Sequence, residues 1–304
     1  MADLTTVIAG VRFKNPVISA SGTYGFGKEY NELFKLEVLG GISCKGLTFQ
    51  ERAGNPPPRI AETPSGILNS VGLQNPGIEF FISNTLPWLK KQNTVVIVNI
   101  AGSTHEDYCR IAARLNATNV DMIELNISCP NVKEGGISFG TSCRGVEKIT
   151  KLVKNECNKP LVVKLSPNVT DIGEIAIAAE AAGANAVSLI NTITGMKIDI
   201  NTRRPVLKNN TGGLSGPAVL PVAIRMVWQV ASKVKIPVIG MGGIATWQDA
   251  VEMMLAGASA LQIGTANFTD AFTPLKIIDG LNAYLDANSI NRASEIVGKV
   301  KCWQ

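Results

Sequence analysis

Short apolar runs rich in valine and isoleucine recur along the chain, and they alternate with segments in which apolar residues repeat at helical spacing. A strand that is apolar along its whole length, rather than at every second position, is typical of a sheet buried on both faces. After a hairpin-like N-terminal stretch at residues 4–13, such runs occupy residues 16–20, 41–45, 95–99, 122–126, 161–164, 186–191, 237–241 and 260–264. We therefore expect eight buried strands.

The segments between these runs carry helix signals. Asp171 precedes a segment that ends at Gly183, and Glu174 is placed three residues after Asp171 to complete a capping box. Between the fourth and fifth runs, the helical period is carried by Val146, Ile149, Leu152 and Val153. Strand–helix alternation repeated eight times predicts an α/β fold, a (β/α)8 TIM barrel with a short N-terminal β-hairpin.

The chain of 304 residues shows no linker, so we expect residues 1–304 to form a single barrel domain. The proline- and glycine-rich piece at residues 54–58 fits a long loop on that barrel. A doubly wound parallel sheet is the alternative fold. The motif GxGxxG, which would favour a dinucleotide-binding sheet of that kind, is absent.

Polar residues gather where the apolar runs end. Because the carboxyl ends of barrel strands meet at one mouth, these residues are expected to lie together, where barrel enzymes place their chemistry. Taken singly, each asparagine would be a turn or cap residue and each lysine a solvent-exposed side chain. The polar strand ends are Lys45, Asn99, Asn126, Lys164 and Asn191.

Glycine-rich turns follow the last two runs, at Gly242-Gly243 and at Gly264-Thr265, and Gly216 precedes the seventh run. Barrels commonly bind a phosphate at this corner through backbone N–H groups. The sequence thus predicts a phosphate-bearing cofactor, and the alternative is that these glycines serve only close packing.

Cys129 follows the fourth run, between Asn126 and Asn131, and residues 133–140 after it have the composition of a mobile loop. A free cysteine is most often a small buried hydrophobe. A thiol beneath a mobile loop at a barrel mouth is also a plausible base or nucleophile. The remaining cysteines are expected to be buried and inert: Cys44, with its side chain opposite to that of Lys45, and Cys109, Cys143, Cys157 and Cys302.

Composition narrows the class of function. The net charge is +5, lysines and arginines are scattered, and no basic cluster indicates a nucleic-acid partner. There is no CxxC pair, and the single histidine, His105, is expected on a surface helix, so no metal site is predicted. No signal peptide or membrane span is evident, and scattered cysteines in a chain of this size favour a cytoplasmic protein.

Several of these segments together resemble the dihydroorotate dehydrogenase family. Residues 69–77 (NSVGLQNPG) resemble its substrate loop, and residues 126–131 (NISCPN) resemble its catalytic loop. The resemblance runs from about residue 5 to residue 298, and further matching pieces lie at residues 21–23, 45–46, 163–167, 190–192, 240–244 and 262–265. It implies an FMN enzyme that oxidises (S)-dihydroorotate to orotate in pyrimidine biosynthesis.

The resemblance also assigns roles to residues. It implies Cys129 as the catalytic base. The implied substrate-binding residues are Lys45, Asn69, Ser70, Val71, Gly72, Leu73, Asn126, Asn131, Asn191 and Thr192. The implied FMN-binding residues are Ser21, Lys45, Gly46, Asn99, Asn126, Lys164, Ile190, Gly216, Gly242, Gly243, Gly264 and Thr265.

The family's subclasses differ at the catalytic loop. A cysteine base excludes the membrane-associated class, which has serine and an N-terminal extension. Residues 132–136 (VKEGG) resemble class 1B more than the fumarate-using class 1A. Class 1B implies a partner subunit that carries FAD and a 2Fe–2S cluster and reduces NAD⁺, with a homodimer of this chain inside a heterotetramer.

Three alternatives remain open from the sequence. The chain could be a class 1A-like, fumarate-using enzyme. It could be another FMN barrel that acts on dihydropyrimidines or on tRNA, although the first is usually part of a much longer chain and the second would need an RNA-binding domain. It could also be a non-catalytic flavin- or phosphate-binding subunit.

Overall fold

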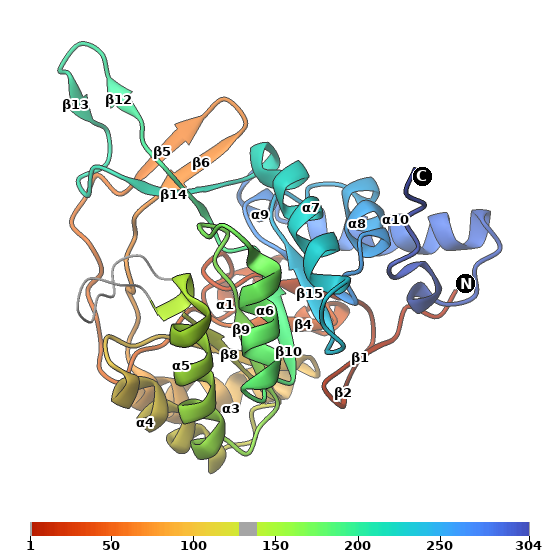
Figure 1. The fold of residues 1–304 in the computed structure, drawn as a ribbon, viewed down its shortest axis with the longest axis horizontal. Coiled ribbons are helices and arrows are strands. Elements are labelled where there is room, and N and C mark those ends of the chain that lie inside the picture. The colour runs from red at the N-terminus through yellow and green to blue at the C-terminus, as the bar shows by residue number, and fades with distance from the viewer. Residues whose placement is uncertain (1, 128–138, 304) are drawn as a thin grey trace.

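The computed structural model describes residues 2–127 and 139–303. Its centre is a closed barrel of parallel strands, hydrogen-bonded in chain order with the last strand beside the first (Figure 1). The barrel strands are β3 (Val17–Ser19), β4 (Gly41–Ser43), β7 (Val95–Ile100), β8 (Met122–Asn126), β9 (Leu161–Lys164), β10 (Ala186–Leu189), β15 (Val238–Met241) and β16 (Ala260–Ile263). Each lies within or overlaps one predicted run. The barrel prediction is therefore confirmed, and the doubly wound sheet is wrong.

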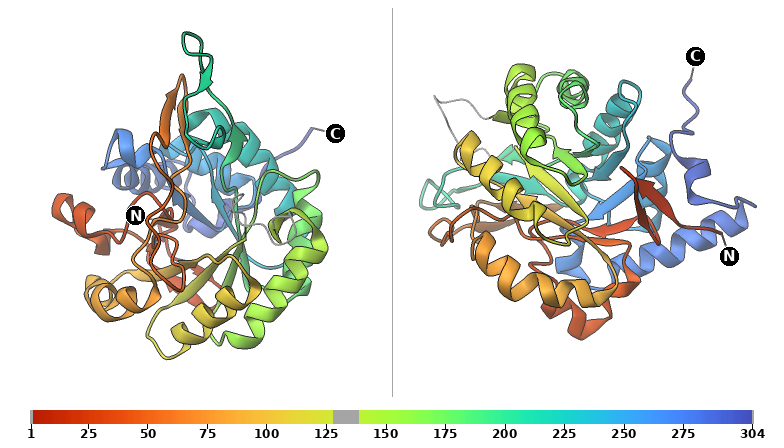
Figure 2. Two further views of the ribbon diagram at one scale, coloured as in Figure 1. Left: turned by 90° about the vertical axis from the view of Figure 1, so that its left-hand side faces the viewer. Right: turned by 90° about the horizontal axis from the view of Figure 1, so that it is seen from below.

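Helices surround the barrel on its outer face (Figure 2). The longer ones are α4 (His105–Asn116), α5 (Cys143–Glu156), α6 (Ile172–Ala181), α7 (Leu220–Ala231), α8 (Trp247–Leu255) and α10 (Thr273–Ala287). Shorter ones are α1 (Lys28–Leu33), α2 (Ile78–Phe80), α3 (Leu86–Leu89) and α9 (Ala266–Thr269). Strand residues such as Val98 and Ile123 share one buried apolar cluster with helix residues such as Ile111 and Ile149. This layer between barrel and helices explains why the strands are apolar on both faces.

Two local helix predictions need correction. Asp171 caps α6 by accepting hydrogen bonds from the backbone N–H groups of Gly173 and Glu174, but the Glu174 carboxylate pairs with Lys233 (3.0 Å) and does not complete a capping box. On α5, Val146, Ile149 and Val153 are buried as predicted, whereas Leu152 is 37% exposed. Leu152 lies at the edge of the apolar stripe, where the helix surface turns toward solvent.

An N-terminal hairpin packs against the end of the barrel opposite the mouth. It consists of β1 (Thr6–Ile8) and β2 (Val11–Phe13), which pair antiparallel, as predicted. Ile8 and Phe13 are fully buried and contact an apolar layer inside the barrel. That layer is formed by Ile18, Ile97, Met122, Val162, Ala186, Ile239 and Ala260.

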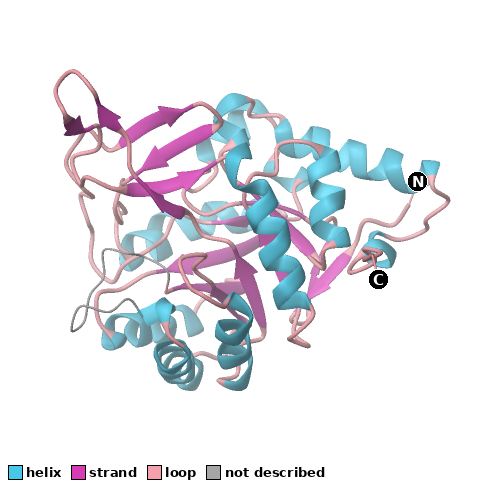
Figure 3. Cartoon of the chain, turned by 45° about the horizontal axis from the view of Figure 1, so that its top comes forward, coloured by secondary structure: helices cyan, strands magenta, loops and turns pink. Residues whose placement is uncertain are grey.

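A second, antiparallel sheet was not predicted. It has the order β11 (Ile193–Gly195), β14 (Gly212–Ser215), β6 (Gly66–Asn69) and β5 (Ile60–Thr63). It joins the insertion after β4 to the insertion after β10, and Asn69 lies opposite Gly213 across it. A small hairpin of β12 (Ile198–Asp199) and β13 (Arg204–Pro205) projects beyond this sheet (Figures 1 and 3). The chain thus places a second layer of structure beside the barrel mouth.

None of the helices in residues 2–127 and 139–303 combines the length and the apolar character needed to cross a membrane.

Candidate active site

A cavity of about 750 Å³ opens at the carboxyl ends of the barrel strands and is bordered by the antiparallel sheet. Its volume suits a cofactor or small substrate. Every predicted site residue that the structure describes lines it: Ser21, Lys45, Gly46, Asn69, Ser70, Val71, Gly72, Leu73, Asn99, Asn126, Lys164, Ile190, Asn191, Thr192, Gly216, Gly242, Gly243, Gly264 and Thr265. Cys129 and Asn131 lie outside the described residues, as do residues 133–138 of the predicted loop.

One corner of the cavity is built from glycine backbone. Gly216 (φ +105°) and Gly243 (φ +81°) occupy the left-handed region that side chains rarely adopt. A Cβ on Gly243 would lie 2.7 Å from Leu220, and a Cβ on Gly216 would lie 2.7 Å from the Cα of Gly66. These glycines therefore serve close packing, and they also form part of the cavity wall with backbone alone, as an anion-binding corner requires. Nearby, the Thr265 hydroxyl donates to Ser215 Oγ (2.8 Å).

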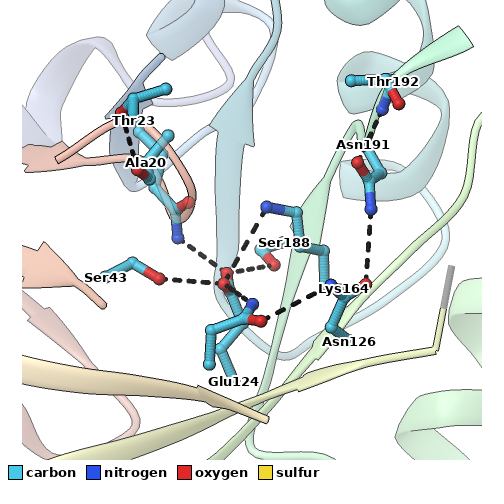
Figure 4. Close-up of polar contacts among 11 residues, drawn as sticks. Ala20, Thr23, Ser43, Glu124, Asn126, Lys164, Ser188, Asn191 and Thr192 are labelled. Atoms are coloured by element: carbon cyan, nitrogen blue, oxygen red, sulfur yellow. Dashed lines mark hydrogen bonds and ion pairs between the residues drawn. The ribbon is translucent and has the colours of Figure 1, made fainter. Parts of the chain in front are cut away.

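The floor of the cavity is a buried polar cluster around Glu124, which the sequence analysis did not single out (Figure 4). The Glu124 side chain is fully buried in the barrel interior. Its Oε1 accepts hydrogen bonds from Ser188 Oγ (2.9 Å) and Gln262 Nε2 (2.7 Å). Its Oε2 accepts from Ser43 Oγ (3.0 Å) and Asn99 Nδ2 (2.6 Å) and lies 3.9 Å from Lys164 Nζ.

Burial raises the pKa of Glu124, because it disfavours the charged carboxylate. The Lys164 ammonium and the hydrogen bonds from Asn99, Gln262 and Ser188 outweigh that effect and hold the pKa below its ordinary value. The floor therefore contains a carboxylate and an ammonium that form an ion pair almost out of contact with solvent.

A chain of amides runs from this floor across the mouth. Asn126 Nδ2 donates to Asn99 Oδ1 (3.5 Å), and Asn191 Nδ2 donates to Asn126 Oδ1 (3.4 Å). The backbone N–H of Thr192 then donates to Asn191 Oδ1 (2.8 Å) (Figure 4). Each amide has both a donor and an acceptor, so the chain can match a ring that alternates C=O and N–H groups.

The loop at residues 70–73 forms the opposite side of the cavity. The backbone N–H of Ser70 donates to Arg59 O (2.8 Å), and Asn55 donates from its side chain to Ser70 O (2.8 Å) and from its backbone to Val71 O (2.9 Å). Asn69, at the end of β6, donates to Gly213 O (3.4 Å). This loop is therefore held in place by backbone contacts and leaves side chains free to face a ligand.

Two buried polar atoms of the cavity lining, Gln262 Oε1 and Ser70 Oγ, have no hydrogen-bond partner in the described part of the chain. Buried polar atoms are usually paired, so such atoms in a cavity wall indicate a ligand that supplies the missing partner. Gln262 lies at the floor and Ser70 in the loop. The cavity thus combines a polar floor, a chain of amides and a corner built from glycines. Together these features fit an elongated ligand with a polar heterocycle and a phosphate.

Of the five cysteines expected to be buried, Cys44 and Cys157 are buried and Cys109 is only partly buried. Cys143 and Cys302 are exposed, so that expectation is wrong for them. Cys44 is buried, and desolvation raises the pKa of its thiol, while the neighbouring Lys45 faces the cavity as predicted. His105 is the first residue of α4 and does not line the cavity. The centroid of its ring lies 4.4 Å from that of the Phe139 ring. Across the described residues, no group of three or more His, Cys, Asp or Glu side chains could hold a metal ion.

The residues missed by sequence reasoning share one signal. Ser43, Glu124 and Ser188 are all polar residues inside runs interpreted as continuously apolar. Gln262 lies in such a run as well, and only the family resemblance of residues 262–265 marked it. A glutamate in the middle of a buried strand, two positions before Asn126, points to the same side of the strand as Asn126. That spacing alone would have found Glu124.

The fold and the site define a class: a (β/α)8 barrel enzyme with a polar cavity at the mouth of the barrel, above a buried ion pair. A family model described as dihydroorotate dehydrogenase matches residues 3–285. The chain belongs to the dihydroorotate dehydrogenase family.

Curated relatives match over nearly their whole length. A protein of Alkaliphilus oremlandii is 55% identical over 293 residues, which cover 96% of this chain and 97% of the relative. A protein of Bacteroides fragilis is 54% identical over 302 residues, 99% of this chain and 100% of the relative. A protein of Caldicellulosiruptor saccharolyticus is 52% identical over 298 residues, which cover 98% of this chain and 99% of the relative. All three are named dihydroorotate dehydrogenase B (NAD(+)), catalytic subunit.

Proposed function

We propose that this chain oxidises (S)-dihydroorotate to orotate in pyrimidine biosynthesis, as the FMN-carrying catalytic subunit of an NAD⁺-linked dihydroorotate dehydrogenase. The observation that carries the proposal is the convergence of the described candidate residues on one cavity of about 750 Å³. The names of relatives more than half identical over nearly the whole chain support the choice of substrate and acceptor.

FMN fits the residues that line this cavity. Backbone at Gly216, Gly242-Gly243 and Gly264-Thr265 would hold its phosphate. The floor residues Asn99, Lys164 and Gln262 would contact its heterocycle, and Gln262 Oε1 would there find a hydrogen-bond donor. Ser21, Lys45, Gly46, Asn126 and Ile190 complete the proposed FMN-binding set. When bound, FMN supplies the acceptor for the hydride from the substrate.

The substrate would lie between the amide chain and the loop at residues 70–73. Asn69, Asn126 and Asn191 offer both donors and acceptors to the ring amides and carboxylate of dihydroorotate, with Thr192 and Lys45 beside them. Asn131, outside the described residues, is proposed to join this set.

The oxidation also releases a proton from C5 of dihydroorotate, and Cys129 Sγ is proposed to take it. A free thiol has a pKa of about 8.5, so only a small fraction is thiolate at neutral pH. We therefore expect the rate of the reductive half-reaction to rise with pH through the neutral range.

The proposed function also includes a partner subunit and an oligomeric state. A separate subunit with FAD and a 2Fe–2S cluster would pass electrons from FMN to NAD⁺, and the word "subunit" in the relatives' name supports a partner of some kind. We propose a cytoplasmic heterotetramer in which two copies of this single-domain chain form a homodimer.

Substitution of the proposed base tests the chemistry. Cys129→Ala should still take up FMN and bind orotate, but flavin reduction by dihydroorotate should slow by roughly 10²-fold or more, the scale of a lost general base. Stopped-flow bleaching of the flavin is the measurement, and Cys302→Ala, which removes an exposed thiol, is the control. Flavin reduction at the wild-type rate in Cys129→Ala would overturn the role of Cys129.

The substrate and the acceptor have separate tests. Dihydroorotate should bleach the flavin and dihydrouracil should not, which separates this function from that of other dihydropyrimidine-oxidising barrels. A co-purifying flavin and iron–sulfur protein should confer NAD⁺-dependent turnover. Rapid reoxidation by fumarate without that protein would instead support the class 1A-like alternative.

A further inference from the structure

The Glu124 carboxylate lies directly behind the cavity floor. Five barrel strands contribute its partners: Ser43 on β4, Asn99 on β7, Lys164 on β9, Ser188 on β10 and Gln262 on β16. Three of these partners line the cavity, namely Asn99, Lys164 and Gln262, whereas Glu124 does not. Glu124 can therefore influence a ligand only through the residues that separate it from the cavity.

The contacts of Glu124 are of two kinds. Four neutral donors satisfy its two oxygens at 2.6–3.0 Å. Lys164 Nζ lies 3.9 Å from Oε2, which is too long for a hydrogen bond. The pair is therefore coulombic, and the hydrogen-bond donors of the ammonium are not consumed by Glu124.

Both charges are almost out of solvent, because the Lys164 side chain is 6% exposed and that of Glu124 is 0% exposed. Within the described residues, no other carboxylate forms an ion pair with Lys164. In such surroundings the interaction of charges is screened far less than in water. Among the described residues, Glu124 is thus the carboxylate that balances the Lys164 ammonium at the cavity floor.

We propose that Glu124 is a positioning residue: it holds the Lys164 ammonium at the cavity floor and offsets its charge, so that the floor is close to neutral toward oxidised flavin. The inference rests on the proposed function, because it takes FMN as the ligand. It adds a role for a residue that touches neither cofactor nor substrate. If the negative charge is removed without a change of shape, the floor becomes cationic and stabilises anionic states of the flavin.

Glu124→Gln is the main variant because glutamine keeps the size of glutamate. The new amide group can be accommodated, because the Ser188 hydroxyl can accept from it and Gln262 can flip so that its Oε1 faces residue 124. That flip would present Gln262 Nε2 instead of Oε1 to FMN, and the double variant with Lys164→Gln, which carries the same glutamine at residue 124, controls for this change. Glu124→Asp keeps the charge and changes the shape. Ser43→Ala is the matched control, because Ser43 donates to the same carboxylate but does not line the cavity.

The midpoint potential of bound FMN and the dissociation constant of sulfite from oxidised flavin are measured in each variant. In Glu124→Gln, the equilibrium constant for two-electron reduction should rise about tenfold, which is a shift of about 30 mV to more positive potential. Sulfite, an anion, should bind about tenfold more tightly, the size of effect that a unit charge exerts over about 10 Å in protein. Glu124→Asp and Ser43→Ala should stay within about twofold of wild type on both readouts, because both keep the charge.

A neutral double variant covers the case in which Glu124→Gln does not fold. Replacing both members of a buried ion pair is tolerated better than replacing one. Lys164→Gln alone should lower the equilibrium constant for reduction about tenfold. Glu124→Gln with Lys164→Gln should return that constant to within about threefold of wild type, because the floor is again neutral.

Three results would overturn the proposal. The first is a midpoint potential in Glu124→Gln that does not differ from that in Ser43→Ala. The second is a shift of the midpoint potential in Glu124→Asp as large as that in Glu124→Gln, which would assign the effect to shape. The third is a double variant that matches Lys164→Gln alone. A wild-type protein that takes up no FMN would overturn the proposed function as well, whereas normal FMN uptake with an unmoved potential would overturn this inference only.

Discussion

The barrel interior has two layers with opposite chemistry, built from the same strands. Toward the N-terminal hairpin the layer is entirely apolar, and all its members are fully buried. Two positions further along several strands, where side chains return to the same side, the layer is polar. Thus Met122 precedes Glu124 on β8, Val162 precedes Lys164 on β9, Ala186 precedes Ser188 on β10, and Ala260 precedes Gln262 on β16.

The difference shows how one scaffold can divide stability from chemistry. The apolar layer is stabilised by burial and close packing, so side chains of similar shape and volume are interchangeable there. The polar layer is stable only when complete, because each buried donor or acceptor needs its partner. Only the polar layer borders the cavity, through Asn99, Lys164 and Gln262.

Glu124→Ala is expected to have the largest effect on stability. It leaves the Lys164 ammonium without its carboxylate and four hydrogen-bond donors without their acceptor. Breaking a buried ion pair on one side should lower the free energy of unfolding by about 4 kcal/mol. Urea unfolding of the apoprotein measures this. A paired replacement, Glu124→Leu with Lys164→Met, should recover only the part of the loss that is due to the unpaired ammonium, because the four donors still lack their acceptor. A loss below about 1 kcal/mol in Glu124→Ala would contradict the view that the polar layer is interdependent.

Met122→Ala tests the apolar layer on the same strand. Met122 is fully buried, so the truncation should lower the free energy of unfolding by about 3 kcal/mol through lost transfer free energy and a cavity. The conservative Met122→Leu should cost less than about 1.5 kcal/mol. Since Met122 does not line the cavity, FMN affinity should stay unchanged. A large loss of FMN affinity in Met122→Ala would show that the two layers are not separate.

The pattern of the sequence predicts most of the barrel, because buried parallel strands are short, apolar and regularly separated by helices. It does not predict the antiparallel sheet beside the mouth. Residues 212–215 (GGLS) carry no strand signal, and their pairing with β6 joins segments more than 140 positions apart in the sequence. Such pairing is set by tertiary contacts that local propensity does not report.

The site was predictable to the extent that strand ends determine it. Lys45, Asn99, Asn126, Lys164 and Asn191 were expected at one mouth, and all line the cavity. Glu124, which holds the polar layer together, was missed because one buried glutamate in an apolar run looks like an exception, and its four neutral partners come from four other strands. Only closure of the barrel brings those strands together.

Of the predicted changes in the free energy of unfolding, the smallest is the one caused by acid pH, and it should affect the polar layer but not the apolar layer. The pKa of Glu124 in the folded chain lies below its ordinary value of 4.5, so the unfolded chain takes up the proton more readily. Its contribution to stability is therefore complete above about pH 4.5 and is lost as the pH falls through the folded pKa. The loss should be smaller than in Glu124→Ala, because protonated Glu124 still fills its space and keeps most of its hydrogen bonds.

The free energies of unfolding of wild type, Glu124→Gln and Met122→Ala, compared between pH 7 and the acid range, measure this loss. Met122→Ala should keep the wild-type acid slope, whereas Glu124→Gln should be shallower, because glutamine does not titrate. If Glu124→Gln instead lost stability as steeply as wild type, the exposed carboxylates would account for the acid sensitivity and the Glu124 ion pair would contribute nothing to it.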